Sequence, residues 1–283
     1  MAGTLYIVAT PIGNLEDITP RALRVLREVD VIACEDTRHT HRLLNHFGIK
    51  TKRISYHEHN EQSRASELCL LLESGKSVAI VSDAGTPLIS DPGFRIVIAA
   101  IQRNIPVVPI PGVTAFVAAL AASGLPSDQF LFAGFLPARA NARRTKLEEV
   151  RDLPATLIFY EAPHRIAATL HDALHILGDR QAVVARELTK LHEEIARGRL
   201  SELGKRFSEG SVRGEIVLLI SSQKVDVPAA TAEPAARLLE RVDELESQGS
   251  DSKQALKKAA RELGIKRDDA YRIVSAQKKR RNK

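Results

Sequence analysis

The sequence predicts an α/β protein with mostly parallel β-sheet, and three observations support this prediction. Eight short runs are rich in Val and Ile and alternate little between apolar and polar residues, which is typical of strands covered on both faces. Segments of helical length fill the gaps between these runs, and strands that alternate with helices favour parallel pairing. Loops rich in Gly and Pro follow several of the runs directly.

The strands are short and can be placed along the chain from their composition. In chain order they are expected at residues 5–9, 29–33, 78–82, 107–110, 131–133, 156–160, 182–185 and 216–220. Between them, three helices have clear ends. Thr19 is an N-cap before Pro20 and opens a helix to about residue 28, residues 61–73 form a helix closed by Ser74-Gly75, and Pro163 opens a helix that ends at Gly178.

The composition is that of a folded protein in a reducing compartment. Of the 283 residues, 44% are hydrophobic, which is enough for a sizeable core, and the length allows one large domain or two to three small ones. Only Cys34 and Cys69 occur, without a CxxC motif, so we expect two buried or partly buried thiols. No apolar run has the length of a membrane span and no signal-peptide pattern is visible, so we expect a cytoplasmic protein with no membrane partner.

Two shifts in composition suggest boundaries between domains. The sequence Ser-Gly-Leu-Pro-Ser at residues 123–127 interrupts the pattern, and residues 224–234 show no pattern of packing. We therefore predict an N-terminal α/β subdomain, a second α/β subdomain, a linker and a basic helical domain, at residues 1–122, 123–223, 224–234 and 235–283.

The last of these parts is expected to contain three helices, at residues 235–246, 252–263 and 268–279, with Asp251 or Ser252 capping the second and Gly264 ending it. Short helices joined by a Gly-containing turn resemble a helix-turn-helix. Residues 253–283 have 12 Lys and Arg against three Asp and Glu, whereas residues 1–252 have 29 against 32. A basic segment beside a mildly acidic body is typical of a polyanion binder, and a solvated, solubilising tail is the alternative.

Several common motifs are absent. Gly75-Lys76-Ser77 matches the end of a Walker motif, but Leu70 stands where the first Gly is required. The sequence has no GxGxxG and no GxSxG. His57, His59 and Glu61 could ligate a metal, but no further Cys or His motif accompanies them, so we expect no metal and interpret Asn60 as a helix cap.

Three Gly/Pro-rich loops follow predicted strands, at residues 10–14, 82–93 and 109–115. In an open α/β sheet, ligands bind beyond the carboxyl ends of the strands. Gly and Pro at this edge hold backbone N–H and C=O groups toward a ligand, or they simply make tight turns. Three such loops together favour a shared pocket.

Seven blocks of sequence occur in the order expected for a known family. They are YIVATPIGNL at 6–15, EDTR at 35–38, YHEHNE at 56–61, SDAGTPLISDPG at 82–93, GFLP at 134–137, YEAPHR at 160–165 and RELTK at 186–190. Over roughly residues 4–222 the chain resembles the bacterial ribosomal RNA small subunit methyltransferase I family. That family belongs to the tetrapyrrole-methylase-like (class III) S-adenosyl-L-methionine (SAM)-dependent methyltransferases.

The resemblance implies two α/β subdomains with SAM in the cleft between them, usually in a homodimer. It implies 2′-O-methylation of a cytidine ribose in the decoding region of 16S ribosomal RNA. The cofactor-binding positions that match are Pro11, Ala84, Gly85, Thr86, Ile89, Thr114, Ala115, Tyr160 and Leu188. Thr86 stands where the family's wider pattern has Asp, which leaves open whether Asp83 makes the missing polar contact.

Methyl transfer to a ribose hydroxyl needs orientation, exclusion of water and removal of a proton, but no metal. Glu187 and Lys190 flank the implied cofactor wall and are the candidate catalytic residues, while Glu35, Asp36 and Arg38 follow the second predicted strand. Each of these residues could instead form a structural ion pair.

Basic residues are the candidates for contact with RNA, because phosphate contacts depend on Lys and Arg. Aromatic residues make up only 4% of the chain and Trp is absent, so base stacking is expected to be minor. We expect recognition of folded RNA, in the assembled small subunit, by Arg139, Arg143, Arg144, Lys146, Arg186, Lys257, Lys258 and Arg272.

Two other functions remain open from the residues alone. A SAM-dependent methyltransferase acting on a tetrapyrrole such as a corrin precursor would have no need of the basic tail. A non-enzymatic regulator would use the helical tail to read DNA and would transfer no methyl group.

Overall fold

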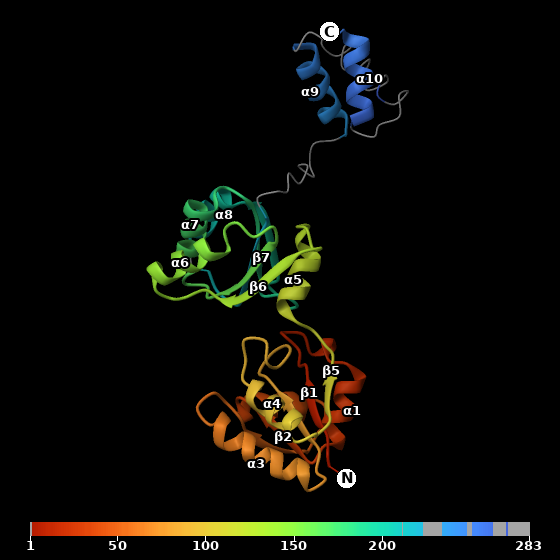
Figure 1. Ribbon diagram of the computed structural model, residues 1–283, viewed down its shortest axis with the longest axis vertical. Helices are drawn as coiled ribbons and strands as arrows, with labels where there is room; N and C mark the ends of the chain where they lie inside the picture. The colour runs from red at the N-terminus through yellow and green to blue at the C-terminus, as the bar shows by residue number, and fades with distance from the viewer. Residues whose placement is uncertain (1, 211, 223–233, 248–250, 263–269, 271–283) are drawn as a thin grey trace. The chain divides into compact units, whose positions relative to one another are not determined.

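The computed structural model describes residues 2–210, 212–222, 234–247, 251–262 and 270 (Figure 1). The chain divides into two compact units, residues 1–225 and 226–283. The first unit contains two five-stranded sheets, and the second contains a pair of packed helices.

The first sheet is parallel throughout, with the strand order β3-β2-β4-β1-β5. Its strands are β1 (Leu5–Val8), β2 (Val31–Cys34), β3 (Lys52–Ser55), β4 (Val78–Val81) and β5 (Val107–Ile110). All residues of β2 and β4 are buried, as expected for central strands covered on both faces.

Helices cover both faces of the first sheet. On one face, α1 (Pro20–Glu28) and α2 (Thr37–His46) contribute Leu26 and Leu44 to the core. A short 3-10 helix, η1 (Leu15–Asp17), lies between β1 and α1 in the chain. On the other face, α3 (Glu61–Glu73) and α4 (Phe94–Gln102) contribute Leu68 and Ile96. The Thr19 hydroxyl accepts a hydrogen bond from the Ala22 amide at 3.1 Å, so α1 begins where the sequence predicts.

The second sheet has the order β6-β7-β10-β8-β9 and is mixed. Its strands are β6 (Phe130–Phe135), β7 (Thr156–Glu161), β8 (Gln181–Arg186), β9 (Glu194–Arg199) and β10 (Ile216–Ile220). Four helices pack around it: α5 (Ala115–Ser123) on one face, and α6 (Ala140–Val150), α7 (Ile166–Leu177) and α8 (Leu200–Ser208) on the other.

The expectation of mostly parallel sheet is wrong for this second half. Only β6 and β7 pair in parallel, whereas β10 is antiparallel to both β7 and β8, and β8 is antiparallel to β9. A short apolar run covered on both faces has the same composition whichever way the strand points, so the sequence pattern gives no direction.

All eight predicted strands are present, with ends shifted by at most two residues, and the predicted helix at residues 61–73 is confirmed as α3. The strands β3 and β9 were not predicted. Both lie at a sheet edge and contain charged residues, in the sequences KRIS and EIARGR. Charged edge strands prevent unwanted pairing and therefore lack the apolar signature of a strand.

The two cysteines are confirmed as free and buried. Helix α5 shares the core of the second sheet through Ala119 and Leu120, although the predicted boundary between residues 122 and 123 puts most of this helix with the first subdomain. The domain boundaries themselves stay predictions.

In the second unit, α9 (Pro234–Ser247) packs against α10 (Ser252–Glu262) through Leu238, Val242 and Ala259. Arg241 joins the two helices by an ion pair with Glu262 at 2.8 Å, and it also pairs with Glu244 of its own helix at 2.7 Å. The predicted helices at 235–246 and 252–263 are thus present, whereas the predicted helix at 268–279 and nearly all of the linker at 224–234 lie outside the described residues. None of the helices that the structure describes is long and apolar enough to span a membrane.

Candidate cofactor cavity

A cavity of about 430 Å³ lies at the carboxyl ends of the first sheet's strands, within the size range of small-molecule sites. The first half contributes Ile12 after β1, residues 83–86 and 89–91 after β4, and Thr114 and Ala115 after β5. The second half supplies Phe135 from β6, residues 160–163 at the end of β7, Ala185 and Leu188 near the end of β8, and residues 214–217 at the start of β10.

Eight of the nine predicted cofactor residues line this cavity: Ala84, Gly85, Thr86, Ile89, Thr114, Ala115, Tyr160 and Leu188. The exception is Pro11, which is buried beside Ile12 and does not contribute to the lining. The structure therefore brings together residues more than a hundred positions apart in the sequence.

Backbone pairing fixes the loops in place. Thr10 and Gly85 exchange N–H···O hydrogen bonds of 2.8 and 3.0 Å, which join the loop after β1 to the loop after β4. Gly85 has φ +80°, which glycine adopts without strain, and a Cβ there would meet the Ile12 side chain at 3.4 Å. The Thr86 and Thr114 hydroxyls lie 2.7 Å apart and join the loops after β4 and β5.

This last contact gives Thr86, which stands where the resemblance implies an Asp, a structural role. Thr86 uses its hydroxyl to hold the neighbouring loop. Asp83 lines the cavity and accepts a hydrogen bond from the Asp36 amide at 3.2 Å.

Backbone strain is concentrated beside the cavity. Five residues other than glycine have positive φ in the part of the chain that the structure describes, and four of them are Leu88, Ser90, Glu187 and Thr189. Leu88 and Ser90 belong to the loop after β4, and the other two follow β8. Such conformations cost about 1–3 kcal/mol each and cluster at functional sites.

The charge of the lining is negative. Asp83, Asp91 and Glu215 of the lining are acidic, as is the buried Glu161, whereas none of the described residues of the lining is Lys or Arg. Burial, with the nearby Glu35 and Asp83 carboxylates, raises the pKa of Asp91 to about 6. Burial and Asp83 also raise the pKa of Glu35. A cationic ligand would relieve this crowding of negative charge.

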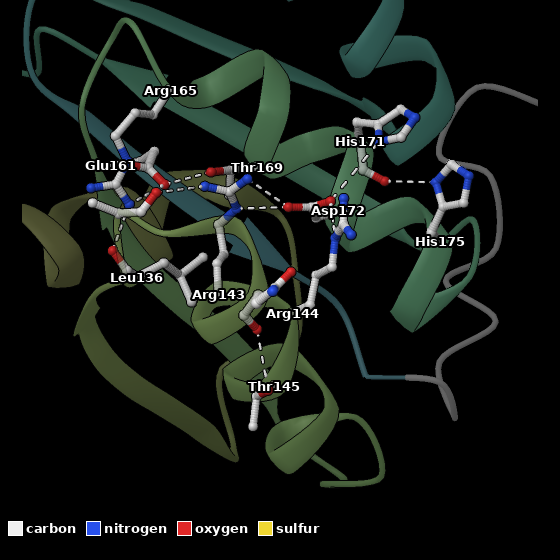
Figure 2. Close-up of polar contacts among 12 residues, drawn as sticks. Leu136, Arg143, Arg144, Thr145, Glu161, Arg165, Thr169, His171, Asp172 and His175 are labelled. Atoms are coloured by element: carbon white, nitrogen blue, oxygen red, sulfur yellow. Dashed lines mark hydrogen bonds and ion pairs between the residues drawn. The ribbon is translucent and has the colours of Figure 1, made fainter.

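The carboxylate of Glu161, in contrast, is already neutralised. Its side chain is fully buried and pairs with Arg165, 3.0 Å from Nε to Oε1. It also accepts hydrogen bonds from the Thr169 hydroxyl at 2.6 Å and the Ala162 amide at 2.8 Å, as Figure 2 shows in part. Glu161 therefore fixes the end of β7 against α7.

The two candidate catalytic residues lie just outside the lining. Lys190 Nζ is 2.7 Å from Glu187 Oε1 and 2.9 Å from Glu215 Oε2. The hydrogen bond from Lys190 lowers the pKa of Glu187, which makes this carboxylate a weaker base. The Lys190 stem covers Gly13, where a Cβ would come within 2.4 Å of its Cγ. Lys190 thus joins the loop after β1 to the second half.

Among the predicted RNA contacts, Arg143 needs correction, because it is buried and not free to bind phosphate. Its guanidinium lies 2.6 Å from Asp172, and Arg144 binds the other oxygen of the same carboxylate at 2.8 Å (Figure 2). Arg143 and Arg144 are adjacent on α6, and the sequence alone does not show which of them is buried. The burial of Arg143 follows from its ion pair with Asp172 of α7.

The other residues predicted to contact RNA differ in exposure and in whether they already form an ion pair. Lys146 pairs with Glu149 at 2.8 Å and Arg186 with Glu194 at 2.8 Å, whereas Arg139 is exposed. In the second unit, Lys257 and Lys258 are exposed on α10. Arg272 lies outside the described residues.

The His57–Glu61 segment forms a turn. Asn60 is at the N-cap position of α3, but its side chain turns back to accept a hydrogen bond from the His57 amide at 2.9 Å. No group of three or more His, Cys, Asp and Glu among the described residues is arranged to hold a metal ion.

Sequence reasoning did not select several residues of the lining, notably Ser90, Asp91, Phe135 and Glu215. The first two belong to the loop at 82–93, whose Gly and Pro content already marked it. Phe135 follows Gly134, whose φ of +64° is part of an irregularity in β6, and its side chain is exposed. Nothing in the sequence marks Glu215 as a cavity residue, because it belongs to a polar segment just before β10.

Comparison with known proteins places this architecture in a class. Residues 4–204 match the family model of Tetrapyrrole (Corrin/Porphyrin) Methylases. A uroporphyrin-III-C-methyltransferase from Thermus thermophilus has a similar fold, with a TM-score of 0.57 and 22% identity over 77% of this chain and 94% of that one. Another structure of this enzyme, a complex with S-adenosyl homocysteine, gives a TM-score of 0.54 at 20% identity, over 77% of this chain and 97% of that one. The protein is a SAM-dependent methyltransferase with the tetrapyrrole methylase fold.

Curated relatives narrow this assignment. The ribosomal RNA small subunit methyltransferase I of Halalkalibacterium halodurans is 49% identical over 273 residues, which cover 96% of this chain and 94% of that protein. The protein of the same name from Vibrio cholerae is 56% identical over 222 residues, 77% of each chain. The chain belongs to the ribosomal RNA small subunit methyltransferase I family.

Proposed function

We propose that the protein transfers a methyl group from SAM to the 2′-hydroxyl of a cytidine ribose in the decoding region of 16S ribosomal RNA. The proposal rests on the cavity, which is a largely apolar pocket at the ends of the strands. Its lining contains acidic residues, and none of its described residues is Lys or Arg. The names of the relatives support the RNA substrate.

The residues of the cavity fit SAM. When bound, SAM supplies an activated methyl group on a positively charged sulfonium. Asp83 and Asp91 would attract its positive charges, since both residues line the cavity and neither has a Lys or Arg partner among the described residues. Tyr160 and Leu188 would form an apolar wall, while Gly85 and Thr114 would present backbone groups.

Removal of the hydroxyl proton needs groups held at the mouth of the cavity. In this proposal Glu187 and Lys190 act as positioning residues, because they bind each other and hold Glu215, which lines the cavity. The left-handed backbone at Glu187 and Thr189 fixes the loop that contains both. A hydroxyl bound beside Glu215 would be close to a carboxylate and an ammonium group.

The proposed acceptor is RNA within an assembled small subunit, in the cytoplasm. Arg139, Lys257 and Lys258 are exposed and could bind phosphates, whereas Arg144, Lys146 and Arg186 would have to exchange a carboxylate for a phosphate. A homodimer is also proposed. Phe94, Ile98 and Ile101 of α4 and Leu70 of α3 are exposed large apolar residues, and a second copy could cover them.

The test is methyl transfer from tritiated SAM to three acceptors in parallel: small ribosomal subunits, bare 16S rRNA and a corrin precursor. Label on a cytidine ribose of the subunits supports the proposal. Label on the corrin precursor alone would favour the tetrapyrrole methyltransferase, and label on a base would refute the 2′-O assignment. Membership of a methyltransferase family argues against the non-enzymatic regulator.

A further inference from the structure

The segment between β2 and the end of β3 is unusually basic. From residue 37 to residue 57 the sequence contains no Asp or Glu. In the same stretch it has five Lys and Arg and three His that belong to α2, β3 and the loop between them: Arg38, His39, His41, Arg42, His46, Lys50, Lys52 and Arg53. We call these eight residues the α2–β3 basic surface.

Most of these side chains are exposed; only Arg53 is partly buried. On α2, the exposed positions Arg38, His41, Arg42 and His46 recur at the spacing of one helix face, whereas Thr40 and Leu44 of the same helix are buried. β3 is at the edge of the sheet, next to β2 only. The basic residues therefore form a continuous exposed margin of the first half.

Ordinary solvent-facing helices of this chain mix positive and negative charges. α1 pairs Arg24 with Glu28 at 2.7 Å, and α6 pairs Lys146 with Glu149 at 2.8 Å. In contrast, Arg42, Lys50 and Lys52 have no ion pair or side-chain hydrogen bond with any residue that the structure describes. Among the described residues, Arg38 forms an ion pair only with the partly exposed Asp36 at the start of its own helix. Repulsion among neighbouring cations that have no ion-pair partner among the described residues is unfavourable for the folded chain. This arrangement therefore indicates that an anionic partner binds here.

The surface also begins at the cavity. Asp36 caps α2, and its backbone amide donates a hydrogen bond to Asp83, which lines the cavity. From there α2 extends about 15 Å, by the rise of a ten-residue helix, before the chain turns back along β3. An acceptor that tracks this surface would reach the rim of the cavity.

We propose that the α2–β3 basic surface binds the phosphate backbone of the RNA substrate and guides it to the cavity; this inference rests on the proposed function. RNA is favoured over a protein partner because the described exposed large hydrophobic residues include none between positions 37 and 57. A protein interface uses aromatic and aliphatic anchors, whereas a phosphate backbone needs only cations.

The test compares two triple variants of the full chain that remove the same charges. One is Arg42→Gln, Lys50→Gln and Lys52→Gln within the surface. The matched control is Lys76→Gln, Arg103→Gln and Lys205→Gln, three exposed cations elsewhere in the first unit. Methyl transfer to small ribosomal subunits is measured at several salt concentrations, and SAM binding is measured by calorimetry.

For the surface variant we expect a KM for the subunits raised roughly tenfold, unchanged SAM affinity, and a log–log salt slope reduced by about two to three. The control should keep the wild-type KM and slope. An unchanged KM and slope in the surface variant, or an equal loss in the control, would overturn the proposal. If the wild-type protein itself leaves the subunits unmethylated, the proposed function fails instead, so the two failures are distinguishable.

Discussion

Charged groups in the interior and at the cavity are arranged differently in the two halves of the first unit. Around the second sheet they neutralise one another, as in Arg143–Asp172–Arg144, Glu161–Arg165 and Glu187–Lys190. Around the first sheet, Asp83 and Asp91 line the cavity without a Lys or Arg partner among the described residues, and Arg42, Lys50 and Lys52 of the α2–β3 basic surface have no carboxylate partner there either. Paired charges hold structure in the second half, as Glu61 and Arg95 also do in the first, but the first half in addition presents charges without an ion-pair partner among the described residues.

The largest effect is expected at Asp172. The variant Asp172→Ala leaves the buried Arg143 without a carboxylate partner, so the free energy of unfolding should fall by about 3–5 kcal/mol. Urea denaturation followed by circular dichroism measures this loss. As a matched control, Asp91→Ala in the first half should not lower stability. Equal losses in the two variants would show that the halves do not differ.

A bulky residue at Gly85 should weaken SAM binding strongly. At φ +80° a β-branched side chain is strained, and it would enter the cavity beside Ile12. We expect Gly85→Val to weaken SAM binding at least about a hundredfold in calorimetry, a loss of roughly 2.7 kcal/mol. The circular dichroism spectrum should stay that of a folded protein. Unchanged affinity would remove this loop from the cofactor site.

Replacing a cavity carboxylate should weaken SAM binding less. Asp91→Asn removes one negative charge near the cationic ligand, for an expected loss of about tenfold. Because the pKa of Asp91 is about 6, SAM affinity of the wild type should fall as the pH drops through 6, and the variant should lack this dependence. Calorimetry between pH 5 and pH 8 would detect the difference.

The same group has a predicted effect on the stability of the ligand-free protein. Folding raises the pKa of Asp91, so the folded chain retains this proton up to about pH 6, whereas the unfolded chain loses it near pH 4. The contribution of Asp91 to stability is therefore greatest below pH 4 and is lost as the pH rises through 6. Asp91→Asn should be more stable than the wild type at pH 8, and lower stability there would contradict the assignment.

The smallest change in stability is expected at Lys190, a partly exposed residue. Lys190→Met keeps the stem over Gly13 but removes the charge between Glu187 and Glu215. The free energy of unfolding should fall by about 1 kcal/mol or less. If the network positions Glu215, kcat for subunit methylation should fall while SAM affinity is retained, and Lys190→Arg should restore part of kcat. Unchanged kcat would limit Lys190 to a structural ion pair.

The sequence predicts the fold best where local signals are strong. Thr19, Ser74-Gly75 and the apolar runs mark their elements, and the Gly/Pro-rich loops mark the place of the cavity. The direction of β10 and the edge strands β3 and β9 could not be predicted, because pairing is decided by partners distant in the chain. For the same reason the burial of Arg143 depends on Asp172, 29 residues later in the chain.

We infer above all that Asp83 and Asp91, which have no Lys or Arg partner among the described residues, mark the site of a positively charged cofactor. A crystal structure of the full chain with SAM tests it most directly. We expect SAM between Gly85 and Tyr160, with its positively charged groups on the side of Asp83 and Asp91. SAM bound elsewhere on the chain, or in this cavity with both carboxylates turned away from it, would show that these carboxylates do not mark the cofactor site.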